Sequence, residues 1–152
     1  MTSRTRSLPR RHAIALAIAL ALPAAGADAA SITVASLLDG PVTADGICTL
    51  REALESINGA AAVGGCTATG AFGTADAVTV TATGTITLNP VEGVLQVLAN
   101  SSITGPGATQ LTISGGGAVP VLYVEDATVS VSGVTLANGD SGTPGAGGAD
   151  VF

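Results

Sequence analysis

The sequence contains very few aromatic residues, which make up 2% of its 152 residues, and it has no tryptophan. A globular core of ordinary shape usually takes much of its volume from Phe, Tyr and Trp. Here the core must be built from Val, Ile, Leu and Ala, since hydrophobic residues still make up 47% of the chain. Such side chains suit short strands that stack in register, and the 21 glycines suit frequent turns.

Positive charge is almost absent after the first eleven residues. From Ala30 onward the chain has ten Asp and Glu residues against one Arg, Arg51, with no Lys and no His, which gives a net charge of −9. Nucleic acids and anionic lipids are both bound through clustered basic side chains. This charge balance argues against a nucleic-acid partner and against adsorption of the mature part to membranes.

The other arginines lie in residues 1–29, which have the composition of a secretory signal peptide. The arginines precede an unbroken apolar run at 13–22, which is too short to span a bilayer. Ala27 and Ala29 are small residues at the two positions that a signal peptidase reads, so cleavage is predicted between Ala29 and Ala30. The alternative is an uncleaved membrane anchor. Cleavage predicts an exported protein, at the outer-membrane surface or outside the cell, with the periplasm as a further alternative.

Residues 48–58 form the one stretch after this leader that is typical of a helix. Apolar side chains recur at the i, i+3, i+4 and i+7 spacing of a single helical face, at Leu50, Ala53, Leu54 and Ile57. Thr49 and Glu52 have the spacing of a capping box, and Asn58-Gly59 is expected to end the helix in a left-handed conformation. Such an amphipathic helix can cover the end of a stacked core.

Arg51, the single base of the mature chain, has two interpretations. It can form a surface pair with Glu55 at i+4, which is the weaker orientation of such a pair. Alternatively, its five donors can tie the helix to loop carbonyls or to an acidic side chain. Both roles are structural.

Cys48 and Cys66 are the only cysteines. In an exported chain an even pair predicts a disulfide, which would close a loop of about 18 residues and stabilise the fold by about 3 kcal/mol in the chain-entropy model. Unpaired thiols are the alternative. A metal site would need more ligands, and a catalytic thiol would need a base that the chain lacks after residue 29.

Short strands with alternating polarity occupy the rest of the chain. The first is Ser31-Ile32-Thr33-Val34, and the others are predicted at 78–80, 85–88, 94–98, 102–104, 111–114, 121–124, 128–131 and 134–136. Corresponding positions repeat at offsets of 27 (Val94 to Val121), 28 (Ile103 to Val131) and 23 (Leu111 to Val134). Periods in this range are typical of solenoids.

The heptapeptide Cys48-Thr49-Leu50-Arg51-Glu52-Ala53-Leu54 resembles the CSLREA motif of secreted bacterial right-handed parallel β-helix proteins. Many of these are similar to polymorphic outer-membrane proteins or surface adhesins. Thr49 stands where that motif has Ser, and Leu54 replaces a common Ile. The similarity continues through Cys66 and through 76–80, 103–108 and 111–115. The motif is specific for fold and export, and it is unspecific for activity.

The repeat offsets and the resemblance to the CSLREA motif together predict an all-β fold. The fold expected is a right-handed parallel β-helix (solenoid) with an N-terminal amphipathic capping helix. Three segments are expected: a signal peptide at 1–29, then the first strand, capping helix and disulfide loop at 30–75, then the coils at 76–152. We expect these coils to be the start of a longer solenoid, with self-association through the open last coil as the alternative.

The sequence offers no cluster of residues typical of catalysis, of a metal site or of a cofactor. Glu125-Asp126 is the only adjacent acidic pair, and such neighbours diverge on a strand or are solvated in a turn. Thr79-Val80-Thr81 resembles the ladders of ice-binding solenoids, but a ladder needs that motif on every coil. We therefore predict a non-catalytic structural or adhesive protein that contacts glycans or other cell-surface ligands. The alternative is the N-terminal portion of a carbohydrate-active β-helix enzyme of lyase or hydrolase type.

Overall fold

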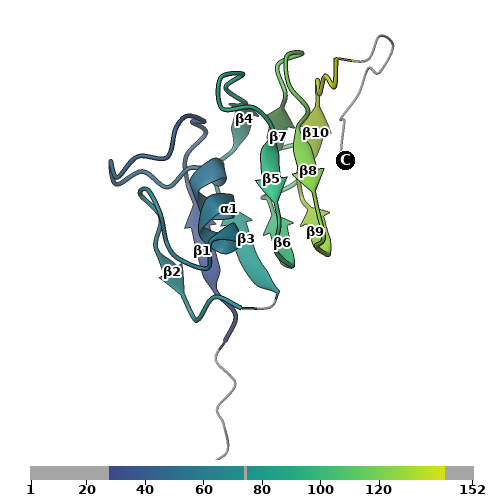
Figure 1. Ribbon diagram of the computed structural model, residues 1–152. Helices are drawn as coiled ribbons and strands as arrows, with labels where there is room; N and C mark the ends of the chain where they lie inside the picture. The colour runs from purple at the N-terminus through teal and green to yellow at the C-terminus, as the bar shows by residue number, and fades with distance from the viewer. Residues whose placement is uncertain (1–27, 74, 143–152) are drawn as a thin grey trace, which may run out of the picture.

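The computed structural model describes residues 28–73 and 75–142, which form strands and a single helix (Figure 1). Most of the predicted signal peptide lies outside the described residues. The strands are β1 (Ser31–Val34), β2 (Ala68–Thr69), β3 (Asp76–Val80), β4 (Gly84–Thr87), β5 (Leu95–Val97), β6 (Ser101–Thr104), β7 (Leu111–Ser114), β8 (Leu122–Val124), β9 (Val129–Ser132) and β10 (Thr135–Ala137). The polarity pattern predicts a strand at each of these places except β2.

The described strands form three sheets, and all their pairings are parallel except that of β1 with β2. The sheets have the strand orders β2-β1-β3-β6-β9, β10-β7-β4 and β5-β8. Three successive strands, β3, β4 and β5, thus lie in three different sheets. The next three, β6, β7 and β8, pair with them in the same order. The fold is therefore strand-rich and largely parallel, as predicted.

The strand register confirms the three offsets read from the sequence. Leu95 pairs with Leu122, which is the offset of 27, and Ile103 pairs with Val131, which is the offset of 28. The third offset, 23, recurs where β7 pairs with β10. A buried side chain lies against the equivalent side chain of the next strand in its sheet, so a shift by one position would turn the core side chains outward.

The core is aliphatic, as the composition requires. Ile32, Val78 and Ile103 are partners in β1, β3 and β6, and each is at most 2% exposed. No aromatic side chain is among the buried core residues of the described chain. Alternation along these strands leaves their other side chains on the outer face.

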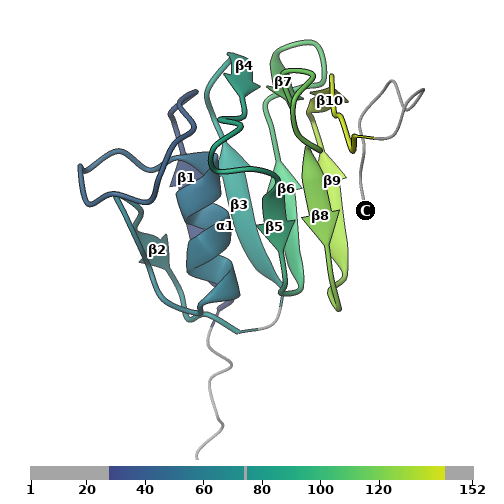
Figure 2. The ribbon, with the colours of Figure 1, turned by 45° about the horizontal axis from the view of Figure 1, so that its top comes forward.

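Helix α1 (Leu50–Asn58) lies beside β5, in line with the row formed by β5 and β8 (Figure 2). The capping box is present: the Glu52 amide donates to the Thr49 hydroxyl at 3.2 Å, and the Thr49 amide donates to the Glu52 carboxylate at 3.1 Å. All four residues of the predicted apolar face are buried. The helix therefore occupies the place of a strand next to β5.

The predicted left-handed stop at Gly59 is wrong by one residue. Gly59 is right-handed, with a φ of −90°, and its amide donates to the Glu55 and Ile57 carbonyls. The left-handed residue is Ala60, with a φ of 50°. The helix itself ends at Asn58, as predicted, and the left-handed residue follows one position later than the Asn-Gly pattern indicated.

At the opposite end, β8, β9 and β10 each have a neighbouring strand on one side only within residues 28–73 and 75–142. Leu122 of β8 is buried, but the other apolar side chains there are only partly buried, at Val124, Val129, Val131, Val134 and Leu136. Across the described ranges, no helix combines the length and the apolar character that crossing a bilayer requires.

Candidate functional site

An ion pair between Arg51 and Asp39 connects helix α1 to the loop that precedes it. The guanidinium donates from Nε and from one terminal nitrogen to the two carboxylate oxygens, each at 2.9 Å. The side chains are 8% and 2% exposed. Asp39 also accepts a hydrogen bond from the Asn89 amide at 2.7 Å. The pair therefore joins the 35–48 loop, the helix and the turn after β4.

The remaining donors of Arg51 bind backbone carbonyls of the turn before β5. They reach the carbonyls of Glu92, Gly93 and Val94 at 3.3, 2.8 and 3.2 Å. All five guanidinium N–H groups are thus used, which matches the second of the two interpretations of this residue. Glu55, the partner in the first interpretation, is exposed.

Glu52 has a second role besides capping. Its carboxylate, in a residue that is 1% exposed, also accepts hydrogen bonds from the Thr43 amide at 2.9 Å and the Gly65 amide at 3.4 Å. The Ser56 hydroxyl accepts from the Val63 amide at 3.0 Å. Polar helix residues are therefore buried because the loops on either side fold over them, which the apolar pattern alone did not predict.

Asn58 extends the edge of β5 with a side chain. Its amide nitrogen donates to the Gln96 carbonyl at 3.0 Å, and its amide oxygen accepts from the Leu98 amide at 2.9 Å. These are backbone groups that a neighbouring strand would otherwise bind. The last residue of the helix thus replaces a strand at this edge.

The predicted disulfide between Cys48 and Cys66 is confirmed, with Cα atoms 4.4 Å apart. It fastens the residue before the helix cap to the loop that follows the helix. A disulfide is consistent with an oxidising, exported environment.

The outer face of β1, β3, β6 and β9 carries two rows of small, mostly hydroxyl-bearing side chains in register. One row is Thr33, Thr79, Thr104 and Ser132, and the other is Ser31, Ala77, Ser102 and Ser130. We call these eight residues the hydroxyl face. All four members of the first row are exposed, and the Ser132 hydroxyl donates to the Thr104 hydroxyl at 3.5 Å.

The hydroxyl face has a regular spacing and no charge. Neighbouring parallel strands lie about 4.8 Å apart, and alternate residues of one strand lie about 6.6 Å apart. None of the eight residues is Asp, Glu, Lys or Arg, although the chain is strongly acidic. The face can therefore exchange hydrogen bonds with a neutral, hydroxylated partner without bringing charges out of water.

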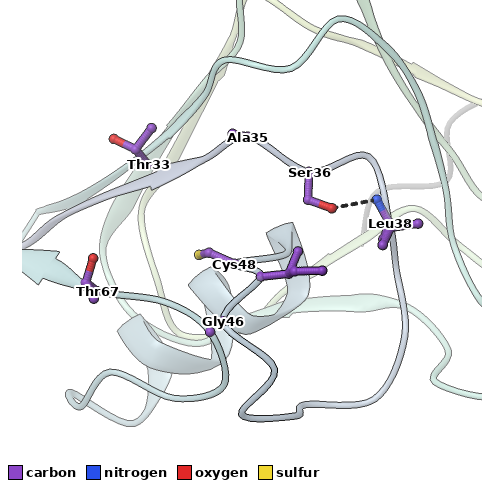
Figure 3. A pocket seen from close by; sticks show the side chains of 9 residues that line it. Thr33, Ala35, Ser36, Leu38, Gly46, Cys48 and Thr67 are labelled. Carbon is purple, nitrogen blue, oxygen red and sulfur yellow. Dashed lines mark hydrogen bonds between the residues drawn. The ribbon is translucent and has the colours of Figure 1, made fainter.

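Two pockets adjoin this face. The larger, with a volume of about 490 Å³, begins at Thr33 and continues along the loop before the helix (Figure 3). It is lined by Thr33, Ala35, Ser36, Leu38, Gly46, Ile47, Cys48, Gly65 and Thr67. The Ser36 hydroxyl in this pocket accepts from the Leu38 amide at 3.1 Å, and Cys48 is in the disulfide, so no lining side chain is a ready acid, base or nucleophile.

The second pocket, of about 390 Å³, lies at the other end of the face beside Ser102 and Ser130. Asn100, Thr128 and Ser101 also line it. The Ser101 hydroxyl is buried, and it is the one buried side-chain polar atom of the described residues that has no hydrogen-bond partner. The Ser101 hydroxyl is therefore a free polar group beside a pocket whose lining is otherwise small side chains.

The remaining candidates from the sequence do not converge on a site. Glu125 and Asp126 are exposed in a turn, where Asp126 has a φ of 52°. Tyr123 lies in register with Gln96 and is partly exposed. Within residues 28–73 and 75–142, no three His, Cys, Asp or Glu side chains are grouped as metal ligands would be.

The hydroxyl face is the feature that sequence reasoning missed. The ladder of ice-binding solenoids requires one Thr-x-Thr motif on every coil, whereas the rows of the hydroxyl face mix Thr with Ser. Aligning the strands by their repeat offsets would have placed Thr79, Thr104 and Ser132 in one row.

Comparison of the chain with models of protein families, with curated protein sequences and with solved structures found no match.

Proposed function

We propose that this chain is the capped first part of an exported right-handed parallel β-helix with a structural and adhesive role. The parallel register between strands that are one repeat apart supports the solenoid, since each strand stacks on the equivalent strand of the next repeat. The helix beside β5 supports the capping role. The resemblance to the CSLREA motif supports export, and the disulfide is consistent with it.

The hydroxyl face carries the adhesive part of the proposal. A regular, uncharged array of hydroxyl groups is complementary to a polymer that also presents hydroxyl groups at regular intervals, such as a neutral polysaccharide. Each contact contributes little, about 1 kcal/mol for a net hydrogen bond, so several must act together. A repeated array on a long strand stack meets this need through multivalency.

Binding to insoluble polysaccharides tests this role. The exported protein is incubated with cellulose and with chitin, which are both neutral polysaccharides, and the bound fraction is measured by sedimentation. Thr79→Val and Thr104→Val remove hydroxyls from the face while they keep a β-branched shape. Thr85→Val is the matched control, because Thr85 is likewise an exposed strand threonine, on β4. The two face variants should bind several-fold more weakly than the wild type and the control.

Equal binding by all four proteins, or no binding to any of the polymers, would refute the adhesive role. The enzyme alternative is tested in the same tubes, by measuring reducing ends and unsaturated uronate products. Release of either product in proportion to protein concentration would replace the non-catalytic assignment. Self-association through the β8, β9 and β10 edge stays a prediction, which sedimentation velocity at several concentrations tests.

A further inference from the structure

Asp76, the first residue of β3, is a buried carboxylate whose partners are backbone amides. The residue is 1% exposed. Its Oδ1 accepts a hydrogen bond from the Ala30 amide at 2.9 Å, and its Oδ2 accepts one from the Gly73 amide at 3.3 Å. Buried carboxylates are rare unless a positive group or strong hydrogen bonds compensate for the lost water.

No side chain from Ala30 onward can supply that positive group. Arg51 is the only cationic side chain in this part of the sequence. All five of its N–H groups are already bound to Asp39 and to the carbonyls before β5. Within residues 30–152, the one other cation is the α-amino group of a chain that begins at Ala30.

We propose that processing between Ala29 and Ala30 creates an α-ammonium group that pairs with Asp76. The inference rests on the predicted cleavage site and is independent of the adhesive role. Hydrolysis adds one water across the Ala29–Ala30 peptide bond. Ala29 leaves with the leader as a carboxylate, and the nitrogen of Ala30 is released as an amine that takes up a proton. This nitrogen is the atom that already lies 2.9 Å from Asp76, so the ion pair forms where a neutral hydrogen bond stood.

The downstream interactions of Ala30 would survive cleavage. The Ala30 carbonyl accepts from the Ala77 amide at 2.8 Å, and β1 pairs with β3 over its whole length. Cleavage would break upstream interactions, the hydrogen bond from the Ala71 amide to the Asp28 carbonyl and the bridge between Ala29 and Ala71. The new terminus would thus be held by strand pairing on one side and by Asp76 on the other.

An unusual property of the sequence makes the pair directly measurable. Residues 30–152 contain no lysine, so protein expressed as residues 1–152 and processed at this bond has one primary amine, its α-amine. The exported protein is first sequenced from its N-terminus, and Ala-Ser-Ile-Thr-Val, from Ala30 to Val34, is the expected result. The protein is then treated with an amine-acetylating ester at neutral pH, folded and in denaturant, and the acetylated fraction is followed by intact mass. Acetylation should be at least about tenfold slower in the folded wild type.

A double-mutant cycle then assigns the protection to Asp76. Wild type and Asp76→Asn are each acetylated in denaturant with the disulfide intact, refolded, and melted beside their unmodified forms. Acetylation should lower the Tm of the wild type by about 5 °C more than that of Asp76→Asn, because only the wild type loses an ion pair. Glu55→Gln removes a charge from the exposed side of the helix, and its response should match the wild type.

Three results would overturn the inference: a mature N-terminus other than Ala30, equal acetylation rates in the folded and the unfolded wild type, or equal Tm losses in both members of the cycle. If Asp76→Asn does not fold, the acetylation rates of the wild type alone decide. No polysaccharide takes part in these measurements, so a failed binding assay and a failed amine assay are separate results.

Discussion

Asp39 and Arg51 are joined by two hydrogen bonds of 2.9 Å each, between a carboxylate that is 2% exposed and a guanidinium that is 8% exposed. Asp39 also binds the Asn89 amide, and Arg51 binds the carbonyls of the turn before β5. The hydrogen bonds of this pair therefore join three segments that are distant in sequence: the loop at Asp39, the helix at Arg51, and the turn at 89–94. This pair holds the helix in place together with its buried apolar face.

Arg51→Ala should lower the free energy of unfolding by about 3–5 kcal/mol, since it leaves the Asp39 carboxylate buried without its counter-ion. Arg51→Lys should recover only part of this loss, because an ammonium group cannot bind the carboxylate and three carbonyls at once. Urea denaturation measures both. Glu55→Ala, on the exposed side of the same helix, is the control and should change stability by less than about 0.5 kcal/mol. Equal stability of Arg51→Ala and this control would contradict the role of the ion pair.

Glu52→Ala should be more destabilising than Thr49→Ala, although both remove half of the capping box. Loss of the Thr49 hydroxyl should cost about 1 kcal/mol. Loss of the Glu52 carboxylate leaves the amides of Thr43, Thr49 and Gly65 without their acceptor, and should cost about 3 kcal/mol. Thermal melts of the two variants, with Thr49→Ser as the control that keeps a hydroxyl, test the order. The reverse order would mean that the two loops do not depend on Glu52.

Protein produced by export should contain no free thiol, and reduction with alkylation should add two alkyl groups at Cys48 and Cys66. The Cys48→Ser/Cys66→Ser variant should be less stable by about 3 kcal/mol, because the unfolded chain loses the constraint of an 18-residue loop. Intact mass and urea denaturation are the measurements. Two reactive thiols in the native exported protein would disprove the disulfide.

Asn58→Ala should expose the edge of β5 to water without unfolding the sheet. The Leu98 amide loses its acceptor and should exchange its hydrogen faster, and stability should fall by about 1 kcal/mol. Asn58→Asp keeps an acceptor for Leu98 but loses the donor to the Gln96 carbonyl, so it separates the two bonds. If Leu98 exchanges equally fast in the wild type and in Asn58→Ala, the side chain does not act as an edge partner.

Elements with local signals were predictable from the sequence. The helix was placed by its apolar spacing and by Thr49 and Glu52, and all of these features are confirmed. The strand offsets were predictable because inward residues such as Ile103 and Val131 must stack on one another. The aliphatic core followed from the lack of aromatic residues.

Features that depend on tertiary contacts were not predictable. Nothing near Arg51 singles out Asp39 among the ten acids as its partner. Strand β2 has two residues, Ala68 and Thr69, and its antiparallel pairing with β1 follows from the path of the disulfide loop rather than from any polarity pattern. Asp76 has the appearance of an ordinary turn residue before a strand, and its burial becomes apparent only when β1 and β6 are placed on either side of β3.

The placement of the Arg51 and Asn58 partners also sets an order of events as the chain is made. Arg51 binds backbone carbonyls that lie 41 to 43 residues downstream, and Asn58 binds the Leu98 amide 40 residues downstream. Neither set of hydrogen bonds can form until the chain has been synthesised beyond Glu92. Closing such long loops is slow compared with local helix formation. The contacts that hold the helix against the turn before β5 and the edge of β5 are therefore completed late, after the strands on which they rest have formed.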